Sequence, residues 1–399
     1  MSTDERLNPA PSIDELLAEA EAFFERVPEI LASATGHIAR SKAYRAALAD
    51  AGLAGINYPS EYGGRGLSNE HAAAFSQYAT PRQPAEEGTF GIGIGMALPT
   101  IRDFGSEEMK DRMLRSGLRG EEIWCQLYSE PGAGSDLAGL TCKAELDGDE
   151  WVVTGQKVWT SGAQNSDLGI LLARTDPEAP KHAGITMFVI PMNQDGVTVR
   201  PLVQMTGESE FNEVFMDEAR IPADWVVGDV NAGWKLGTAL LAHERTSIGK
   251  GQMTKHAEKS KSGRFPIPVE GLLERAAEAG RRDDPVVRDA IAQAYIGERI
   301  IPWLALRRAH PSIGKLWRTL QGRFVAQIAH ELGGPTAQAW EADDTDADYW
   351  QYHVLNCRGM SLGGGTDEVQ KNTLGERVLG LPREPGPDRN TPFRDLLKN

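Results

Sequence analysis

The chain has 399 residues, 40% of them hydrophobic and 25% charged, and its formal net charge at pH 7 is −15. Such a composition is that of an ordinary soluble globular protein, and this length favours two or three domains. The negative charge disfavours nucleic acids and anionic membranes as partners. No apolar run approaches membrane-spanning length, the three cysteines lack metal-ligand spacing, and the first residues do not resemble a signal peptide. We therefore expect a cytoplasmic protein without a metal site.

Helical patterns dominate residues 1 to about 122. Ser12 and Glu15 have the spacing of a capping box and precede apolar residues at helical spacing, so a helix is expected to begin there. A turn-rich stretch from Tyr58 to Leu67 interrupts the helices. The alternating glycines of residues 91–96 lack the features of a phosphate-binding loop and favour close packing of helices.

From about residue 123 to 232 the pattern changes to short runs with a period of two. Gly, Asp and Pro separate the runs, and Asp147-Gly148-Asp149 predicts a hairpin turn. Because no helical segment lies between them, the strands predict an antiparallel barrel or sandwich. The expected strands are residues 123–128, 151–159, 168–173, 185–190 and 213–216.

Helical patterns resume at about residue 233 and continue to about 380, where a proline-rich tail begins. The sequence therefore predicts an α+β multidomain fold in three parts. These are an N-terminal helical domain (1–122), a middle β domain (123–232) and a C-terminal helical domain (233–399).

Three motifs carry the candidate chemistry. Residues 127–136 read L-Y-S-E-P-G-A-G-S-D, and the glycines at 132 and 134 are expected to let the backbone turn sharply and approach a ligand closely. Hydroxyl and N–H groups around such a turn suit phosphate oxygens or the polar edge of a flat ring. Residues 155–161 read G-Q-K-V-W-T-S and are expected to form a strand. Residues 363–372 read G-G-G-T-D-E-V-Q-K-N.

Together these motifs resemble the flavin-binding signatures of the acyl-CoA dehydrogenases, and the resemblance covers nearly the whole chain. It implies FAD as the cofactor and α,β-dehydrogenation of an acyl-CoA thioester to a trans-2-enoyl-CoA. In that reaction a carboxylate removes the proton next to the thioester carbonyl while a hydride passes from the β carbon to flavin N5. The resemblance also implies the helix–sheet–helix order, an electron-transfer flavoprotein as electron acceptor, and a homotetramer or heterotetramer.

The expected base of this reaction is displaced in this chain. Most members of the family carry the catalytic glutamate directly before the Gly-Thr of the C-terminal motif, where Gly364 stands here. Glu244 has Leu240 one turn before it and Ile248 one turn after it on the same face of an expected helix. Desolvation on an apolar face raises the pKa of a carboxyl group, as a base of this kind requires.

The position of Glu244 resembles that of the base in the isovaleryl-CoA branch, where a glutamate precedes an arginine. We therefore predict Glu244 as the catalytic base, with a buried ion pair as the alternative role. Arg245 is expected to orient the site or a substrate group, and a salt bridge is an equally good interpretation.

The resemblance assigns contacts on the first two motifs. The backbone around Tyr128 and Ser129 would meet the pyrimidine edge of the flavin. Trp159 would pack against the isoalloxazine, unless it is an aromatic residue of the sheet core, and Ser161 would donate a hydrogen bond towards N5. Gly134 belongs to the same cofactor loop. Ser135 would lie near a phosphate or the acyl-CoA entrance, in contact with cofactor or substrate.

Further cofactor contacts are expected in the C-terminal part. They are Gly334, Thr366, Glu368 and Arg281. Thr366 and Glu368 match positions near the adenosine of FAD, although a glutamine is usual at the second. Arg281 or Arg282 would replace the phosphate-binding arginine of an R-x-x-F-G motif that this chain lacks, unless both belong to a solvated charge run. In Gly364-Gly365, a substrate-binding pair, the N–H of Gly364 would hold the thioester oxygen.

Two other functions remain open. One is a flavoenzyme on the same fold that passes electrons to oxygen, although oxidases usually carry a further C-terminal domain. The other is a non-catalytic or half-site subunit of a heteromeric acyl-CoA dehydrogenase, which Gly364 favours and Glu244 disfavours. The end of the chain around Thr391–Asp395 looks like that of a bacterial subgroup that includes enzymes acting on bulky or sterol side-chain acyl-CoAs.

Overall fold

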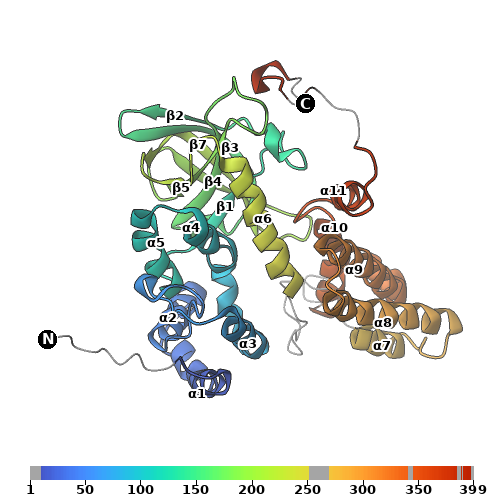
Figure 1. Ribbon diagram of the computed structural model, residues 1–399. Helices are drawn as coiled ribbons and strands as arrows, with labels where there is room; N and C mark the ends of the chain where they lie inside the picture. The colour runs from blue at the N-terminus through green and yellow to red at the C-terminus, as the bar shows by residue number, and fades with distance from the viewer. Residues whose placement is uncertain (1–9, 251–268, 340–344, 384–387, 389, 397–399) are drawn as a thin grey trace. The chain divides into compact units, whose positions relative to one another are not determined.

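The chain forms two compact units, each described by itself below. The computed structural model describes all residues except 1–9, 251–268, 340–344, 384–387, 389 and 397–399, and except the side chains of 242–250, 336 and 345–348. Unit 1 comprises Met1–Leu202, Phe211–His243 and Arg389–Asn399, and unit 2 comprises Val203–Glu210 and Glu244–Asp388. The predicted order of helices, then sheet, then helices is confirmed (Figure 1).

Unit 1 begins with helices α1 (Ile13–Ala32), α2 (His37–Asp50), α3 (Asn69–Ala79), α4 (Leu98–Phe104) and α5 (Glu107–Arg119). The predicted capping box at the start of α1 is present, because Ser12 Oγ accepts from the Glu15 N–H at 3.2 Å and the Ser12 N–H donates to Glu15 Oε2 at 2.7 Å. The glycines of residues 91–96 were expected to allow close packing of helices. At Gly93 the close contact is with the sheet, because a Cβ atom there would lie 3.0 Å from the ring of Trp124, and at Gly91 no atom lies within 4 Å.

The sheet of unit 1 contains the strands β1 (Trp124–Leu127), β2 (Lys143–Asp147), β3 (Glu150–Ser161), β4 (Leu168–Arg174), β5 (Ile185–Pro191), β6 (Val197–Leu202), β7 (Phe211–Pro222) and β8 (Val226–Val227). Their order is β6-β7-β3-β2-β4-β5-β8, with β1 beside β4. β1 and β2 run parallel to β4 and the other pairs are antiparallel, so the sheet is mixed. The predicted turn at Asp147-Gly148-Asp149 joins β2 to β3, and Gly148 has a φ of 66°.

The first turns of α6 (Gly233–Lys250) pack on this sheet. Leu236 and Leu240 belong to the same buried core as the strands β4 and β5. The approach is close, because a Cβ atom on Gly233 would lie 2.6 Å from the carbonyl carbon of Thr186 in β5. The division between the two units falls within this helix, after His243.

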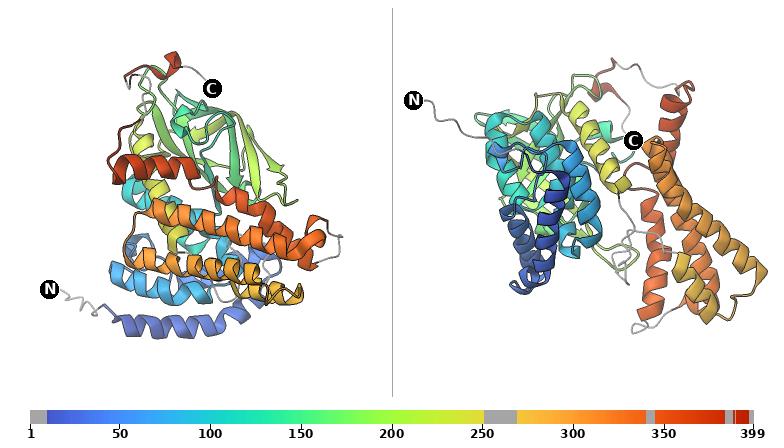
Figure 2. Two further views of the ribbon diagram at one scale, coloured as in Figure 1. Left: turned by 90° about the vertical axis from the view of Figure 1, so that its right-hand side faces the viewer. Right: turned by 60° about the horizontal axis from the view of Figure 1, so that its bottom comes forward.

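Unit 2 is helical and consists of α7 (Val269–Glu278), α8 (Pro285–Leu306), α9 (Pro311–Gly333), α10 (Thr345–Met360) and α11 (Asp367–Thr373). Its core lies around α9, where Val325 and Ala329 are buried together with Leu272 of α7 and Ile291 of α8. Helices α8 and α9 lie side by side (Figure 2). Within the ranges described above, no helix is both long enough and apolar enough to span a membrane.

Candidate functional site

A buried ion pair holds the loop of residues 128–136 against β3. Lys157, which is 0% exposed, donates from Nζ to Glu130 Oε1 at 2.8 Å and to the Tyr128 carbonyl oxygen at 3.1 Å. Burial alone would raise the pKa of the Glu130 carboxyl group, but Lys157 and the N–H groups of Thr141 and Cys142 hold this pKa below its ordinary value. The carboxylate is therefore charged and its acceptor sites are occupied by donors, as a buried ion pair requires.

Backbone hydrogen bonds complete the attachment of the loop. The Val158 N–H donates to the Ser129 carbonyl oxygen at 2.8 Å, and Glu130 and Ala133 exchange two backbone hydrogen bonds that close the turn. Gly132 lies in this turn and Gly134 directly follows it, and neither has a positive φ. Both are exposed, and no atom lies within 4 Å of the position that a Cβ would occupy. Their contribution is open space in front of the loop.

Trp159 lies in a bulge of β3. Lys157 pairs with Val214 of β7 and Thr160 pairs with Asn212, so β3 has one residue more than β7 between these pairs. Trp159 has a φ of 61°, a left-handed conformation that costs about 1–2 kcal/mol in a residue other than glycine. Its side chain is 60% exposed and contacts the Phe211 ring edge-on, so the alternative of a sheet-core aromatic was wrong. Strain of this kind is concentrated at functional sites.

Ser161 ends β3 next to this bulge. It is half-buried and pairs with Phe211 at the start of β7. The buried Asn212 donates from Nδ2 to the Thr160 carbonyl oxygen at 3.0 Å and to Gln164 Oε1 at 2.6 Å, which fixes the end of β3. We call the Glu130–Lys157 pair and the Val158–Ser129 hydrogen bond the loop–strand clamp. In the loop on its other side, Tyr128 is buried, Ser129 is half-buried, and Gly134 and Ser135 are exposed. Unit 1 therefore brings together the residues that the first two motifs predicted.

A second cluster of predicted residues lies in unit 2, at the start of α11. Gly364 and Gly365 have φ angles of 65° and 87°, and among the described residues no acceptor for the Gly364 N–H is present. The side chain of Gln370 reaches back and donates to the Gly364 carbonyl oxygen at 2.9 Å. The hydroxyl of Thr366 caps α11 by accepting from the Val369 N–H at 3.2 Å, while Glu368 is exposed on the first turn.

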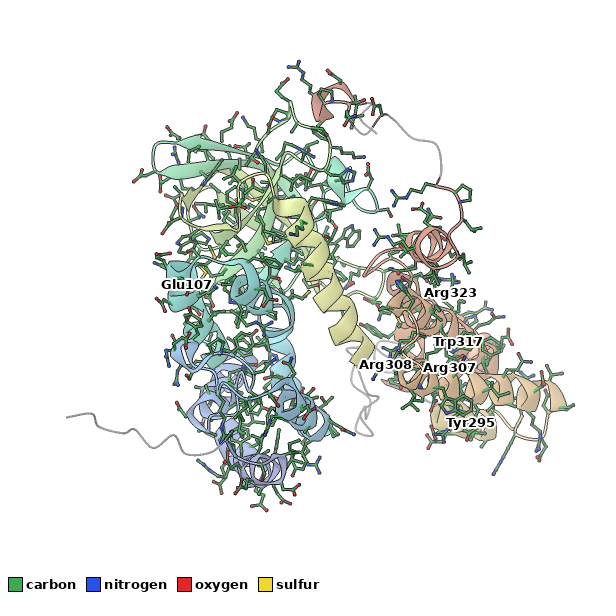
Figure 3. The ribbon with its side chains drawn as sticks, in the orientation of Figure 1. Glu107, Tyr295, Arg307, Arg308, Trp317 and Arg323 are labelled. Carbon is green, nitrogen blue, oxygen red and sulfur yellow. The ribbon has the colours of Figure 1, made fainter. Side chains whose placement is uncertain are left out.

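A buried aspartate anchors this glycine-rich turn to α9. Asp367 accepts from Lys315 Nζ at 3.1 Å and from Thr319 Oγ1 at 2.9 Å. Nη2 of Arg323 lies 3.5 Å from the second oxygen of Asp367. Figure 3 labels Arg323 on α9. Lys315 also donates to the Ser361 carbonyl oxygen at 3.3 Å. Burial would raise the pKa of the Asp367 carboxyl group, but these donors hold it below its ordinary value.

The remaining predicted residues are placed as follows. Arg281 forms an ion pair with Asp284 at 2.8 Å, and Asp284 caps α8, so the guanidinium of Arg281 belongs to a local capping arrangement. Gly334 ends α9 with a φ of 57°. Glu244 and Arg245 belong to the helical backbone of α6, but their side chains lie outside the described residues.

Sequence reasoning missed three of the residues that build these clusters. Glu130, Lys157 and Asp367 entered the sequence analysis only as letters of their motifs, with no role assigned. A signal was available for Lys157, because the period of two places it on the same face of the expected strand as Trp151 and Val153, where a charged side chain needs a partner. No group of three His, Cys, Asp or Glu side chains that could hold a metal ion is found among the described residues.

The fold combines a helical, a β and a second helical region, and the Glu130–Lys157 pair fixes a loop on a strand of the β region. The family description "Acyl-CoA dehydrogenase, N-terminal domain" matches residues 11–121, and "Acyl-CoA dehydrogenase, middle domain" matches residues 125–219. The chain belongs to the acyl-CoA dehydrogenase family, and is thus an acyl-CoA dehydrogenase-type oxidoreductase.

Curated relatives and solved structures agree with this membership. The acyl-CoA dehydrogenase IpdE1 of Mycobacterium tuberculosis is 39% identical over 353 residues, which are 86% of this chain and 88% of the relative. The structure titled "Tcur3481-Tcur3483 steroid ACAD" is 27% identical with a TM-score of 0.72, covering 95% of this chain and 100% of that one. The ChsE4–ChsE5 complex of Mycobacterium tuberculosis is 28% identical with a TM-score of 0.69, covering 95% of this chain and 100% of that one.

The family is FAD-dependent, and the residues of unit 1 fit that cofactor. The open space in front of Gly132 and Gly134 leaves room for a ligand along the loop backbone. The exposed face of Trp159, held out by the bulge, offers a flat apolar surface for a flavin ring.

Proposed function

We propose that the protein is an FAD-dependent acyl-CoA dehydrogenase that converts an acyl-CoA thioester to a trans-2-enoyl-CoA, with Glu244 as the base. The observation that carries the proposal is the buried Glu130–Lys157 pair, which fixes the loop of residues 128–136 beside the strand that presents Trp159 and Ser161. Structural charges of this kind are placed where a loop must keep one conformation. We also propose that the chain has three domains, with boundaries after residues 122 and 232.

The proposal assigns one role to each of the residues that follow. Trp159 and the backbone of Tyr128–Ser129 would hold the flavin, which would supply the acceptor for the hydride that leaves the β carbon. Glu244 accepts the α proton, and its apolar neighbours on α6 favour the neutral product of that transfer. The N–H of Gly364 donates to the thioester oxygen and stabilises the negative charge that develops there.

The sharpest test of the base is the substitution Glu244→Gln. We expect the variant to bind FAD and acyl-CoA normally but to lose reduction of the flavin under anaerobic conditions, because an amide cannot accept the α proton. The matched control is Glu270→Gln, which changes an exposed glutamate of α7. The flavin of this variant should be reduced at the same rate as that of the unaltered protein. If the flavin of Glu244→Gln were still reduced at nearly the full rate, Glu244 would not be the base.

The role of Ser161 is tested by Ser161→Ala. A lost hydrogen bond to N5 should slow flavin reduction without abolishing it, since the base and the substrate contacts remain. Stopped-flow absorbance at the flavin band measures this rate. An unchanged rate would show that Ser161 has no part in the reduction step.

Substrate and electron acceptor follow from the relatives. A structural relative carries "steroid ACAD" in its title, and we propose a bulky, polycyclic acyl-CoA as the substrate class. A panel of acyl-CoAs, from short and branched to polycyclic, tests this by the rate of anaerobic flavin reduction. We propose an electron-transfer flavoprotein as the acceptor; fast reoxidation of the reduced enzyme by air would instead favour the oxygen-using alternative.

The second candidate is a non-catalytic or half-site subunit of a heteromeric enzyme. It is favoured by Gly364, which has no side chain where the family base is usual, and by structural relatives that are complexes of two different chains. Absorbance and light scattering of the chain purified alone discriminate between the candidates. A yellow homotetramer that acyl-CoA bleaches supports the enzyme, whereas a colourless chain, or a flavin that acyl-CoA cannot bleach, supports the structural subunit.

A further inference from the structure

The end of the described chain returns to unit 1 and docks on the loop between β4 and β5. The short helix η9 (Phe393–Asp395) lies beside this loop, at the red end of the ribbon (Figure 1). Two backbone hydrogen bonds join them, from the Phe393 N–H to the Ala179 carbonyl oxygen at 3.0 Å and from the Arg394 N–H to the Pro177 carbonyl oxygen at 3.1 Å. Phe393 is only 8% exposed, so the tail is anchored by a buried ring.

The ring of Phe393 covers a buried arginine. The guanidinium carbon of Arg174, at the end of β4, lies 3.7 Å from the centre of this ring. Arg174 is 4% exposed, and burial lowers its pKa to about 10, so the guanidinium remains charged at neutral pH. A ring face stabilises such a desolvated cation in place of water.

Arg174 in turn holds residues 138–140, which follow the loop of residues 128–136. Its Nη2 donates to the Ala138 carbonyl oxygen at 2.7 Å and lies 3.4 Å from that of Leu140, while Nη1 donates to the Lys181 carbonyl oxygen at 2.9 Å. Lys181 forms an ion pair with Asp136 at 2.5 Å. Two basic side chains therefore bind the segment 136–140 from the side of the β4–β5 loop.

Residues 134 and 135, directly before this segment, are open to a ligand. Gly134 and Ser135 are exposed, and no atom lies within 4 Å of a Cβ position on Gly134. Arg174 and Lys181 hold residues 136–140, which directly follow this stretch, and so limit the positions that Gly134 and Ser135 can adopt. Backbone N–H groups and the Ser135 hydroxyl are suitable donors to phosphate oxygens.

We propose that the C-terminal tail, residues 391–396, is a positioning element that fixes the loop 134–140 for the phosphate groups of the coenzyme A ester. Phe393 acts through Arg174 and does not touch the ligand. The inference rests on the proposed function for the identity of the ligand, while the effect of the tail on the loop does not depend on it.

The test compares three variants of the full-length, FAD-loaded protein. Phe393→Ala removes the ring, and Phe393→Tyr keeps a ring over Arg174. Arg394→Ala leaves the ring in place and removes the exposed ion pairs with Glu178 and Asp395. In Phe393→Ala we expect about tenfold faster hydrogen exchange in the amides of residues 134–142. The KM for acyl-CoA should rise about three- to tenfold with kcat within about twofold, because a ring over a buried cation favours binding geometry and not the chemical step.

Phe393→Tyr and Arg394→Ala should match the unaltered protein in both measurements. The inference is overturned if either the exchange of residues 134–142 or the KM is unchanged in Phe393→Ala, or if Arg394→Ala changes them as strongly. Failure of the proposed function has a different signature. In that case no acyl-CoA reduces the flavin of the unaltered protein, whereas the exchange rates still report whether the tail fixes the loop.

Discussion

A fully buried lysine needs a fixed partner for its charge, and Lys157 has Glu130 and the Tyr128 carbonyl oxygen. The pair makes no contact that suggests acid–base chemistry, because both ends of the carboxylate are already occupied by donors. Its consequence is geometric, since it joins the loop of the first motif to the strand of the second motif. Each motif therefore needs the other to keep its conformation.

Lys157→Met leaves the buried Glu130 carboxylate without its counter-charge. We expect a loss of about 3–5 kcal/mol in the free energy of unfolding, as for one-sided removal of buried ion pairs. The double variant Lys157→Met with Glu130→Gln should recover part of this loss, because a neutral amide oxygen can still accept from the N–H group of Thr141 or of Cys142. Urea denaturation measures both, and Lys143→Met, which breaks the exposed Lys143–Glu145 pair, is the control that should stay within about 1 kcal/mol. A similar loss in the control and in Lys157→Met would contradict the role of burial.

The strained conformation of Trp159 predicts a trade-off between stability and flavin binding. Trp159→Gly removes the left-handed strain and little buried surface, so flavin-free protein should become more stable by up to about 1 kcal/mol. The same variant should bind FAD at least about tenfold more weakly, because the loss of an aromatic stacking contact costs about 1.4 kcal/mol of binding free energy. Glu218→Gly is a matched control on β7, with a φ of 56° and an exposed side chain. It should gain stability and keep its FAD affinity in a fluorescence titration; equal affinities in the two variants would sink the stacking role of Trp159.

At the scale of elements, glycines determine how closely α6 approaches the sheet. A Cβ atom on Gly233 would lie 2.6 Å from the Thr186 carbonyl carbon and 2.7 Å from the Met187 nitrogen, and backbone atoms in a buried strand cannot move aside. We expect Gly233→Ala to lower the free energy of unfolding by about 1–3 kcal/mol, the range for overpacking. Gly91→Ala, where no atom lies within 4 Å, should leave it nearly unchanged. Equal stabilities in denaturant would show that α6 can shift to accept the methyl group.

The strands that sequence patterns revealed are those with the clearest burial. β4 and β5 are buried along almost their whole length and were predicted within one residue of their ends. β2 and β6 were not predicted although both alternate apolar and polar residues, because the runs are short and Ala144 is the single fully buried residue in the two strands. The bulge at Trp159 also gave no signal, since it depends on the partner strand β7, which is distant in sequence.

The candidate site shows the same limit at the level of single residues. The residue types at Ser129, Trp159 and Ser161 were recognisable from their motifs, and the structure places all three at the loop–strand clamp. The tail contact between Phe393 and Arg174 could not be inferred, because nothing in either local sequence points to the other. Long-range contacts of this kind are a property of the fold.

At the scale of the whole molecule, the described residues of each unit include one buried, charge-paired carboxylate whose pKa is held below its ordinary value. Glu130 serves unit 1 and Asp367 serves unit 2. A carboxyl group with a lowered pKa in the folded state contributes stability that is present above its unfolded pKa, about 4.3 for Glu and about 3.9 for Asp. That contribution is lost as pH falls through the folded-state pKa.

We therefore expect the thermal stability of the whole protein to fall steeply below about pH 4, with each unit losing its own carboxylate contribution. Glu130→Gln should weaken unit 1 and flatten its acid dependence, and Asp367→Asn should do the same for unit 2. Calorimetry from pH 3 to pH 7, combined with hydrogen exchange resolved by segment, assigns each effect to a unit. If either variant retained the full acid dependence of its own unit, the lowered pKa in that unit could not be the source of its acid sensitivity.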